Sequence, residues 1–83
     1  MNPTYITCTR WFQKSYGNTY HKVRLHYADG TTMISPTTYG YGDQCLFTAL
    51  QMFEPGSTTH PSLRLRELGI PYVVQDVTRE RDM

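Results

Sequence analysis

Two turn signals divide the first half of the chain into three short β-rich segments. Residues 5–13 and 19–27 are rich in Thr, Tyr, Val and other residues that favour strands. Between them lie Gly17 and Asn18, which we expect to supply positive φ in a turn. Asp29 and Gly30 form a two-residue hairpin signal before a third strand over residues 31–35, which ends at Pro36. Connections this short predict three consecutive antiparallel strands.

Side-chain alternation assigns the strand residues to two faces. A tight turn at residues 17–18 or 15–18 pairs even-numbered residues of the first strand with odd-numbered residues of the second. The predicted core face holds Ile6, Cys8, Arg10, Phe12, His21, Val23, Leu25 and Tyr27, and the two-residue turn adds Thr32 and Ile34 to it. The predicted outer face holds Tyr5, Thr7, Thr9, Trp11, Gln13, Tyr20, Lys22, Arg24, His26 and Met33.

The second half of the chain predicts helices and a last strand. Asp43 occupies an N-cap position before a helix over Gln44–Phe53, which is apolar around most of its circumference. Pro61 and Gly69 favour a short helix over residues 62–68, although the alternation within this segment leaves a strand open. Tyr72–Val77 predicts a strand. We therefore expect one α+β domain over residues 1–83, with residues 78–83 as a frayed charged tail. Its antiparallel sheet of three N-terminal strands plus a C-terminal strand packs on one main helix and a short second helix.

Charge is distributed unevenly along the chain. The first 28 residues contain four cations and six of the eleven aromatic residues but no acid, whereas the rest carries a net charge of about −3, so the net charge of +1 conceals a polarity. Cations meet phosphate charge and aromatic rings meet the flat faces of bases. This composition favours a nucleotide-type ligand.

The candidate binding residues come mainly from the first two strands. On the outer face, Trp11 and Tyr20 offer stacking surfaces, while Lys22 and Arg24 offer phosphate contacts. Arg10 and His21 interrupt the apolar face, and Arg10 either meets an anionic ligand or forms a structural pair with Asp43 or a backbone carbonyl. The full candidate set is Arg10, Trp11, Tyr20, His21, Lys22, Arg24, His26, Tyr39 and Tyr41.

The loop that contains Tyr39 and Tyr41 has two interpretations. It reads Tyr-Gly-Tyr-Gly directly before the main helix, which resembles a glycine-rich loop that lets backbone N–H groups approach phosphate. Asp43 would compete for those N–H groups and repel an anion, so we favour a tight connection.

Metal binding, catalysis and membrane insertion are not indicated. His21 and His26 fall on opposite strand faces, and no Cys-x-x-Cys or His-x-x-x-His spacing exists, so we expect no metal or cofactor. Cys8 and Cys45 predict buried free thiols and not a nucleophile or a disulfide, which favours a protein that is not an enzyme. No segment approaches the roughly 20 apolar residues of a membrane span, and the N-terminus lacks signal-peptide features. We expect a cytoplasmic protein.

Residues 10–23 contain an Arg-Trp-Phe string followed by Gly-Asn-Thr-Tyr-His. This pattern, with the later Tyr39-Gly40-Tyr41 segment and the charged C-terminal end, resembles small phage and prophage open reading frames. The resemblance implies a phage-encoded accessory protein in the host cell, and small proteins of this kind often counter host defence. The leading expectation is sequestration of a nucleotide signal. The alternatives are direct inhibition of a host defence protein and single-stranded nucleic-acid binding, against which the near-neutral net charge weighs.

We predict self-association, because a chain of 83 residues builds a thin core and its main helix is apolar around most of its circumference. Light scattering should give a dimer or larger homo-oligomer at micromolar concentration. A monomer mass that persists up to high concentration would contradict this prediction.

Overall fold

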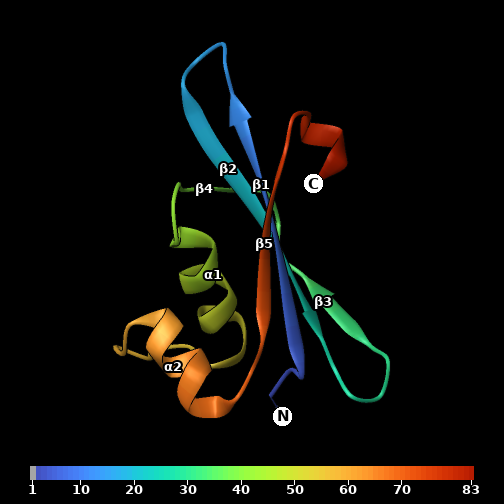
Figure 1. Ribbon diagram of the computed structural model, residues 1–83, viewed down its shortest axis with the longest axis vertical. Coiled ribbons are helices and arrows are strands. Elements are labelled where there is room, and N and C mark those ends of the chain that lie inside the picture. The colour runs from blue at the N-terminus through green and yellow to red at the C-terminus, as the bar shows by residue number, and fades with distance from the viewer. Residues whose placement is uncertain (1) are drawn as a thin grey trace.

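The computed structural model describes residues 2–83 and has an α+β architecture, as the sequence predicts (Figure 1). The strands are β1 (Tyr5–Gln13), β2 (Asn18–His26), β3 (Thr32–Ile34), β4 (Thr38–Tyr39) and β5 (Tyr72–Val77). The helices are α1 (Gln44–Phe53) and α2 (Pro61–Leu68), followed by a short 3-10 turn, η1 (Glu80–Asp82), within residues 78–83. Both α-helices lie on the same side of the sheet, so the molecule has two layers.

The sheet is mixed. Its order is β3-β2-β1-β5, and β4 pairs with β2 beyond the end of β3. β1, β2 and β3 are antiparallel, as expected, but β5 runs parallel to β1. The two helices return the chain to the end of the sheet where β1 begins, so β5 starts beside β1 and follows its direction. β4 is an addition within a segment that the sequence predicts as a loop.

The first hairpin has the predicted faces with a different turn. Residues 14–17 form the loop, where Gly17 has a φ of 71° and donates its N–H to the carbonyl of Gln13 at 2.8 Å. Asn18 already belongs to β2 and has no positive φ, so its predicted role in the turn is wrong. The resulting register places Arg10 directly opposite His21.

The second hairpin reverses the faces predicted for β3. Its loop contains three residues, Ala28 to Gly30, because Tyr27 and Thr31 are joined by a backbone hydrogen bond of 3.0 Å. Of the loop residues only Gly30 has a positive φ, whereas the expected two-residue turn needs positive φ at Asp29 as well. One extra loop residue shifts the register of β3 on β2 by one position, so the side chains of β3 exchange faces. Met33 pairs with Leu25 on the core side, while Thr32 and Ile34 lie on the outer face.

The core lies between the helices and the predicted core face of β1 and β2. Its fully or nearly fully buried apolar residues are Ile6, Cys8, Val23, Leu25, Cys45, Leu46, Ala49, Leu50, Leu65 and Ile70. Cys8 and Cys45 are free thiols, as predicted. Phe12 is an exception on this face, because the end of the hairpin extends beyond the helices and leaves it 52% exposed.

α1 has the predicted bounds, and α2 begins at Pro61, one residue before the predicted start. Pro61 stands at the first position of α2, and Gly69 ends that helix with a left-handed φ of 70°. This excludes the strand that the alternation left open. Asp43 lies at the N-cap position of α1, but its side chain makes no capping hydrogen bond.

Gly30→Val should lower the free energy of unfolding by about 1–3 kcal/mol, because a β-branched residue is strained at its φ of 89°. The matched control is Gly30→Asn, since asparagine tolerates this conformation and no atom lies within 4 Å of the added Cβ. Chemical unfolding of the three proteins measures the effect. Equal stability of the valine variant and the parent would contradict the assigned loop.

Candidate functional site

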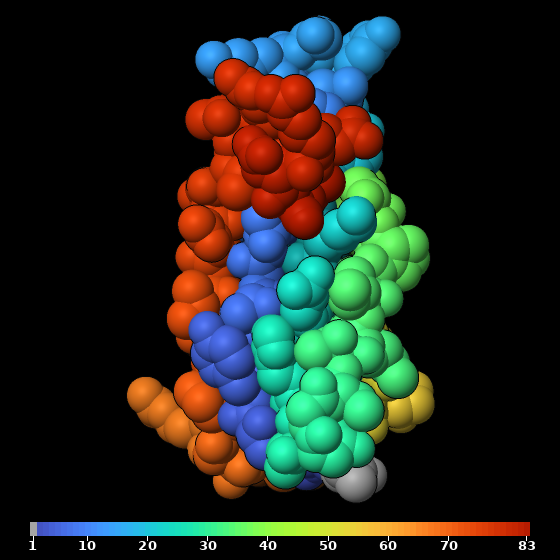
Figure 2. Space-filling view, turned by 90° about the vertical axis from the view of Figure 1, so that its right-hand side faces the viewer, coloured from blue at the N-terminus to red at the C-terminus, as the bar shows by residue number. Residues whose placement is uncertain are grey.

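The face of the sheet opposite the helices carries most of the predicted binding residues. We call this the outer face; from β1 and β2 it presents Tyr5, Thr7, Thr9, Trp11, Tyr20, Lys22, Arg24 and His26. Cross-strand pairing places Thr9 opposite Lys22 and Thr7 opposite Arg24. Neither α1 nor α2 covers this face, and in Figure 2 the C-terminal residues cross part of it.

Aromatic rings form a row at one end of the outer face. The rings of Trp11 and Tyr20 stack with centroids 5.8 Å apart and planes inclined by 26°. Tyr39 from β4 extends the row, with its ring edge-on to Tyr20 at 5.7 Å. The cross-strand register produces this row, because Trp11 pairs with Tyr20 and Tyr20 pairs with Tyr39. Such a row offers flat surfaces of the kind on which bases stack.

A hollow of about 350 Å³ lies along the same two strands, and the three rings of the aromatic row are not part of its lining. Its lining includes Lys22 and Arg24 together with the hydroxyl-bearing residues Thr7 and Thr9. His26 completes one wall, with its Nε2 3.1 Å from Oγ1 of Thr7. Among residues 2–83, neither Lys22 nor Arg24 takes part in an ion pair within 4 Å. The hollow therefore presents two cations and two hydroxyls that can donate hydrogen bonds to an anion.

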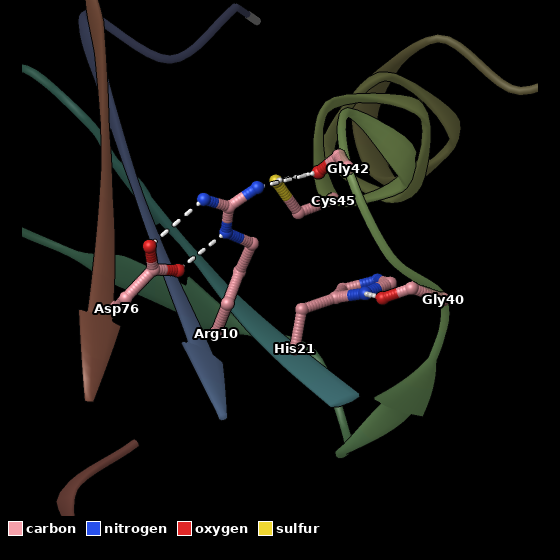
Figure 3. Close-up of polar contacts among 6 residues, drawn as sticks. All are labelled: Arg10, His21, Gly40, Gly42, Cys45 and Asp76. Atoms are coloured by element: carbon pink, nitrogen blue, oxygen red, sulfur yellow. Dashed lines mark hydrogen bonds and ion pairs between the residues drawn. The ribbon is translucent and has the colours of Figure 1, made fainter. Parts of the chain in front are cut away.

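Arg10 lies on the opposite, core side of the sheet and is held by the protein itself (Figure 3). Its guanidinium donates two hydrogen bonds to the carboxylate of Asp76, from Nε at 2.7 Å and from Nη2 at 3.0 Å. Nη1 donates to the carbonyl oxygen of Gly42 at 3.0 Å. The hydrogen bonds with Asp76 raise the pKa of Arg10 and lower that of Asp76. This geometry favours the structural alternative for Arg10, with Asp76 in place of the expected Asp43.

His21 is fully buried and is also satisfied internally. Its Nδ1 lies 3.2 Å from the carbonyl oxygen of Gly40 (Figure 3). Its Nε2 lies 2.7 Å from Oγ1 of Thr48. A carbonyl oxygen only accepts, so Nδ1 carries the hydrogen, and in the neutral ring Nε2 accepts from the hydroxyl. Burial lowers the pKa of His21. His21 therefore fixes the loop before α1 and does not face a ligand.

The Tyr39–Gly42 loop packs closely against α1, which agrees with the tight connection. A Cβ on Gly40 would stand 2.4 Å from Cγ of Gln44. Tyr41 is 76% exposed and lines a separate hollow of about 710 Å³ with Phe47 and His60. That hollow is larger than the one on the outer face, but the described residues that line it include no lysine or arginine, so it suits an anionic ligand less.

The structure thus divides the predicted site residues into three groups. Trp11, Tyr20, Lys22, Arg24, His26 and Tyr39 share the outer face, Arg10 and His21 belong to the interior contacts, and Tyr41 lies apart on the loop. Thr7 and Thr9 join the candidate site through the same alternation that places Trp11, although sequence reasoning did not select them. Asp82 also lines the hollow, and no local pattern indicated this.

Comparison of the chain with known proteins identifies no relative. No family model matches the chain, and neither curated proteins nor solved structures give a significant match. Within residues 2–83, no helix is long and apolar enough to cross a membrane. The same part of the chain holds no group of three His, Cys, Asp or Glu residues arranged for a metal ion.

We predict that stability falls on mild acidification because of His21. Its pKa in the folded state lies below the ordinary value of 6.5, so below pH 6.5 the unfolded chain binds more protons than the folded one. The stabilisation is complete above pH 6.5 and is lost as the pH falls toward the folded-state pKa. Urea unfolding between pH 7.5 and pH 5, with NMR titration of the His21 ring, measures both quantities. A folded-state pKa at or above 6.5 would contradict the prediction.

Proposed function

We propose that the protein is a non-enzymatic binding protein for a nucleotide-type ligand, which it holds on the outer face. One observation carries the proposal: a hollow lined by Lys22 and Arg24 lies on the same two strands as the stacked rings of Trp11 and Tyr20, on the sheet face opposite the two α-helices. Phosphate and base are joined in a nucleotide, and this face offers a complementary group for each of them within a short length of two strands.

Recognition of the phosphate rests on Lys22, Arg24 and the two threonines. The cations supply charge-assisted hydrogen bonds, which are stronger than neutral ones, and the hydroxyls of Thr7 and Thr9 add neutral donors. The base stacks on the Trp11–Tyr20 pair, where stacking contributes about 1–3 kcal/mol per base. Stacking contacts the flat face of a base and not its hydrogen-bonding edge. The outer face is therefore expected to bind nucleotides as a class without selecting one base.

The thiols support a binding role in place of catalysis. Cys8 and Cys45 are each only 1% exposed, and no ligand on the outer face can reach them. Hydrogen bonding to Cys45 and burial raise the pKa of Cys8, so its thiolate is disfavoured. Because the chain resembles small phage reading frames, we propose that the nucleotide it sequesters is a signal of host defence.

A single strand of nucleic acid is the second candidate, and the aromatic row on the outer face favours it. The row extends across β1, β2 and β4, so it offers more than one ring on which successive bases could stack. A polymer that contacts both cations should bind with a salt dependence of about −1.4 in log K against log salt, since each phosphate contact contributes about −0.7 on single strands.

The test uses Trp11, the only tryptophan, as a fluorescent probe. Adenosine triphosphate and a short single-stranded oligonucleotide are titrated separately, and saturable quenching by the first at low concentration supports the nucleotide site. Lys22→Glu with Arg24→Glu should weaken binding by about tenfold or more, the scale of one lost charge-assisted hydrogen bond.

The matched control is Lys14→Glu with Arg66→Glu, which makes the same change in net charge at two exposed positions outside the hollow. Its affinity should stay within about twofold of the parent, a difference well below 1 kcal/mol. If the two double variants lose affinity equally, the effect is due to overall charge and the site is refuted. The site is also refuted if the parent binds neither probe.

A further inference from the structure

The C-terminal segment, residues 78–83, occupies part of the outer face. β5 ends at Val77, which pairs with Trp11, and the chain then turns back over the sheet through η1 (Figures 1 and 2). Asp82 and Met83 thereby line the same hollow as Lys22 and Arg24. The segment thus forms part of the wall of the hollow in which the proposed ligand would lie.

The charge of Asp82 is opposite to that of the cations that line the hollow. Among residues 2–83, Asp82 is the only acidic residue in the lining of the hollow, and the two cations there are Lys22 and Arg24. A carboxylate in the lining of the hollow is attracted by these cations as a phosphate would be. The residue therefore complements the site in charge.

The segment is only weakly attached. Its backbone hydrogen bonds are internal, from Asp82 N–H to the Arg79 carbonyl and from Met83 N–H to the Glu80 carbonyl. Among residues 2–83, none of the ion pairs within 4 Å involves Asp82. Exposed charge attractions of this kind contribute at most about 1 kcal/mol, so the attachment is easily reversed.

We propose that residues 78–83 are a reversible internal occupant of the anion site. The Asp82 carboxylate stands in for the ligand phosphate, and ligand binding displaces it. This inference rests on the proposed function, because the segment inhibits only if the hollow binds an anion. The apparent affinity is then the intrinsic affinity reduced by the fraction of molecules in which the segment is released.

The first measurement needs no ligand. Backbone 15N relaxation of Asp82 and Met83 should show an ordered segment in the parent. In Asp82→Asn their order parameters should fall below about 0.6, the range of flexible backbone. Glu80→Gln is the matched control: it removes one negative charge from the same turn, but Glu80 does not line the hollow, so the segment should stay ordered.

The second measurement is the affinity for pyrophosphate and for adenosine triphosphate, which calorimetry determines. Asp82→Asn, and a chain that ends at Thr78, should bind both about three- to tenfold more tightly than the parent, as expected when most molecules have the segment docked. Glu80→Gln should bind like the parent. Addition of pyrophosphate to the parent should release the segment in the relaxation measurement.

The outcomes separate the two proposals. A segment that is equally mobile in the parent and in Asp82→Asn overturns the internal occupant, even if the parent binds nucleotide normally. An ordered segment that Asp82→Asn releases, in a protein that binds neither pyrophosphate nor nucleotide, overturns the proposed function, and with it the inhibitory role. Release together with tighter binding supports both.

Discussion

The Arg10 guanidinium connects three parts of the chain that are distant in sequence. From the middle of β1 it reaches Asp76 on β5 and the carbonyl of Gly42 in the loop before α1. The side chain is only 26% exposed, so it requires partners, and it receives a carboxylate and a carbonyl. The same contact joins the N-terminal hairpin to the last strand and positions the start of the main helix. On the reverse of β1, the neighbouring Thr9 and Trp11 lie in the outer face.

The two faces of the central hairpin use polar residues in opposite ways. On the core side, Arg10 and His21 have their hydrogen-bonding groups satisfied within the chain. On the outer side, Lys22 and Arg24 line a hollow without a close ion pair among residues 2–83. Internal satisfaction is what a buried polar group needs for stability, whereas donors left to solvent remain available to another molecule. This contrast, more than residue type, distinguishes structural from candidate binding residues.

Local pattern predicted most of the helices and strands and the sheet face on which most of the candidate residues lie. The β1–β2 alternation separated Trp11, Lys22 and Arg24 from the core, and Pro61 with Gly69 marked the ends of α2. These signals depend on neighbours in sequence. The faces of β3 were assigned wrongly, because they depend on whether its loop has two or three residues, and the Asp29-Gly30 pair fits both.

Non-local pairing accounts for what remained unpredicted. Asp76 is 66 residues from Arg10, and only the parallel register of β5 on β1 sets them opposite each other. The antiparallel expectation for β5 failed for the same reason, since strand direction depends on how the two helices return the chain. The position of Asp82 over the hollow follows in turn from where β5 ends.

The two-layer arrangement separates the residues that form the core from the residues that are available to contact other molecules. Every apolar side chain of the core lies between the helices and one face of the sheet, so the other face is free of packing constraints over much of its area. Residues there can be exchanged during evolution without repacking the interior. A lineage of such chains could therefore retain one scaffold while its members diverge in the molecules they recognise, with sequence drift concentrated at alternate positions of β1 and β2.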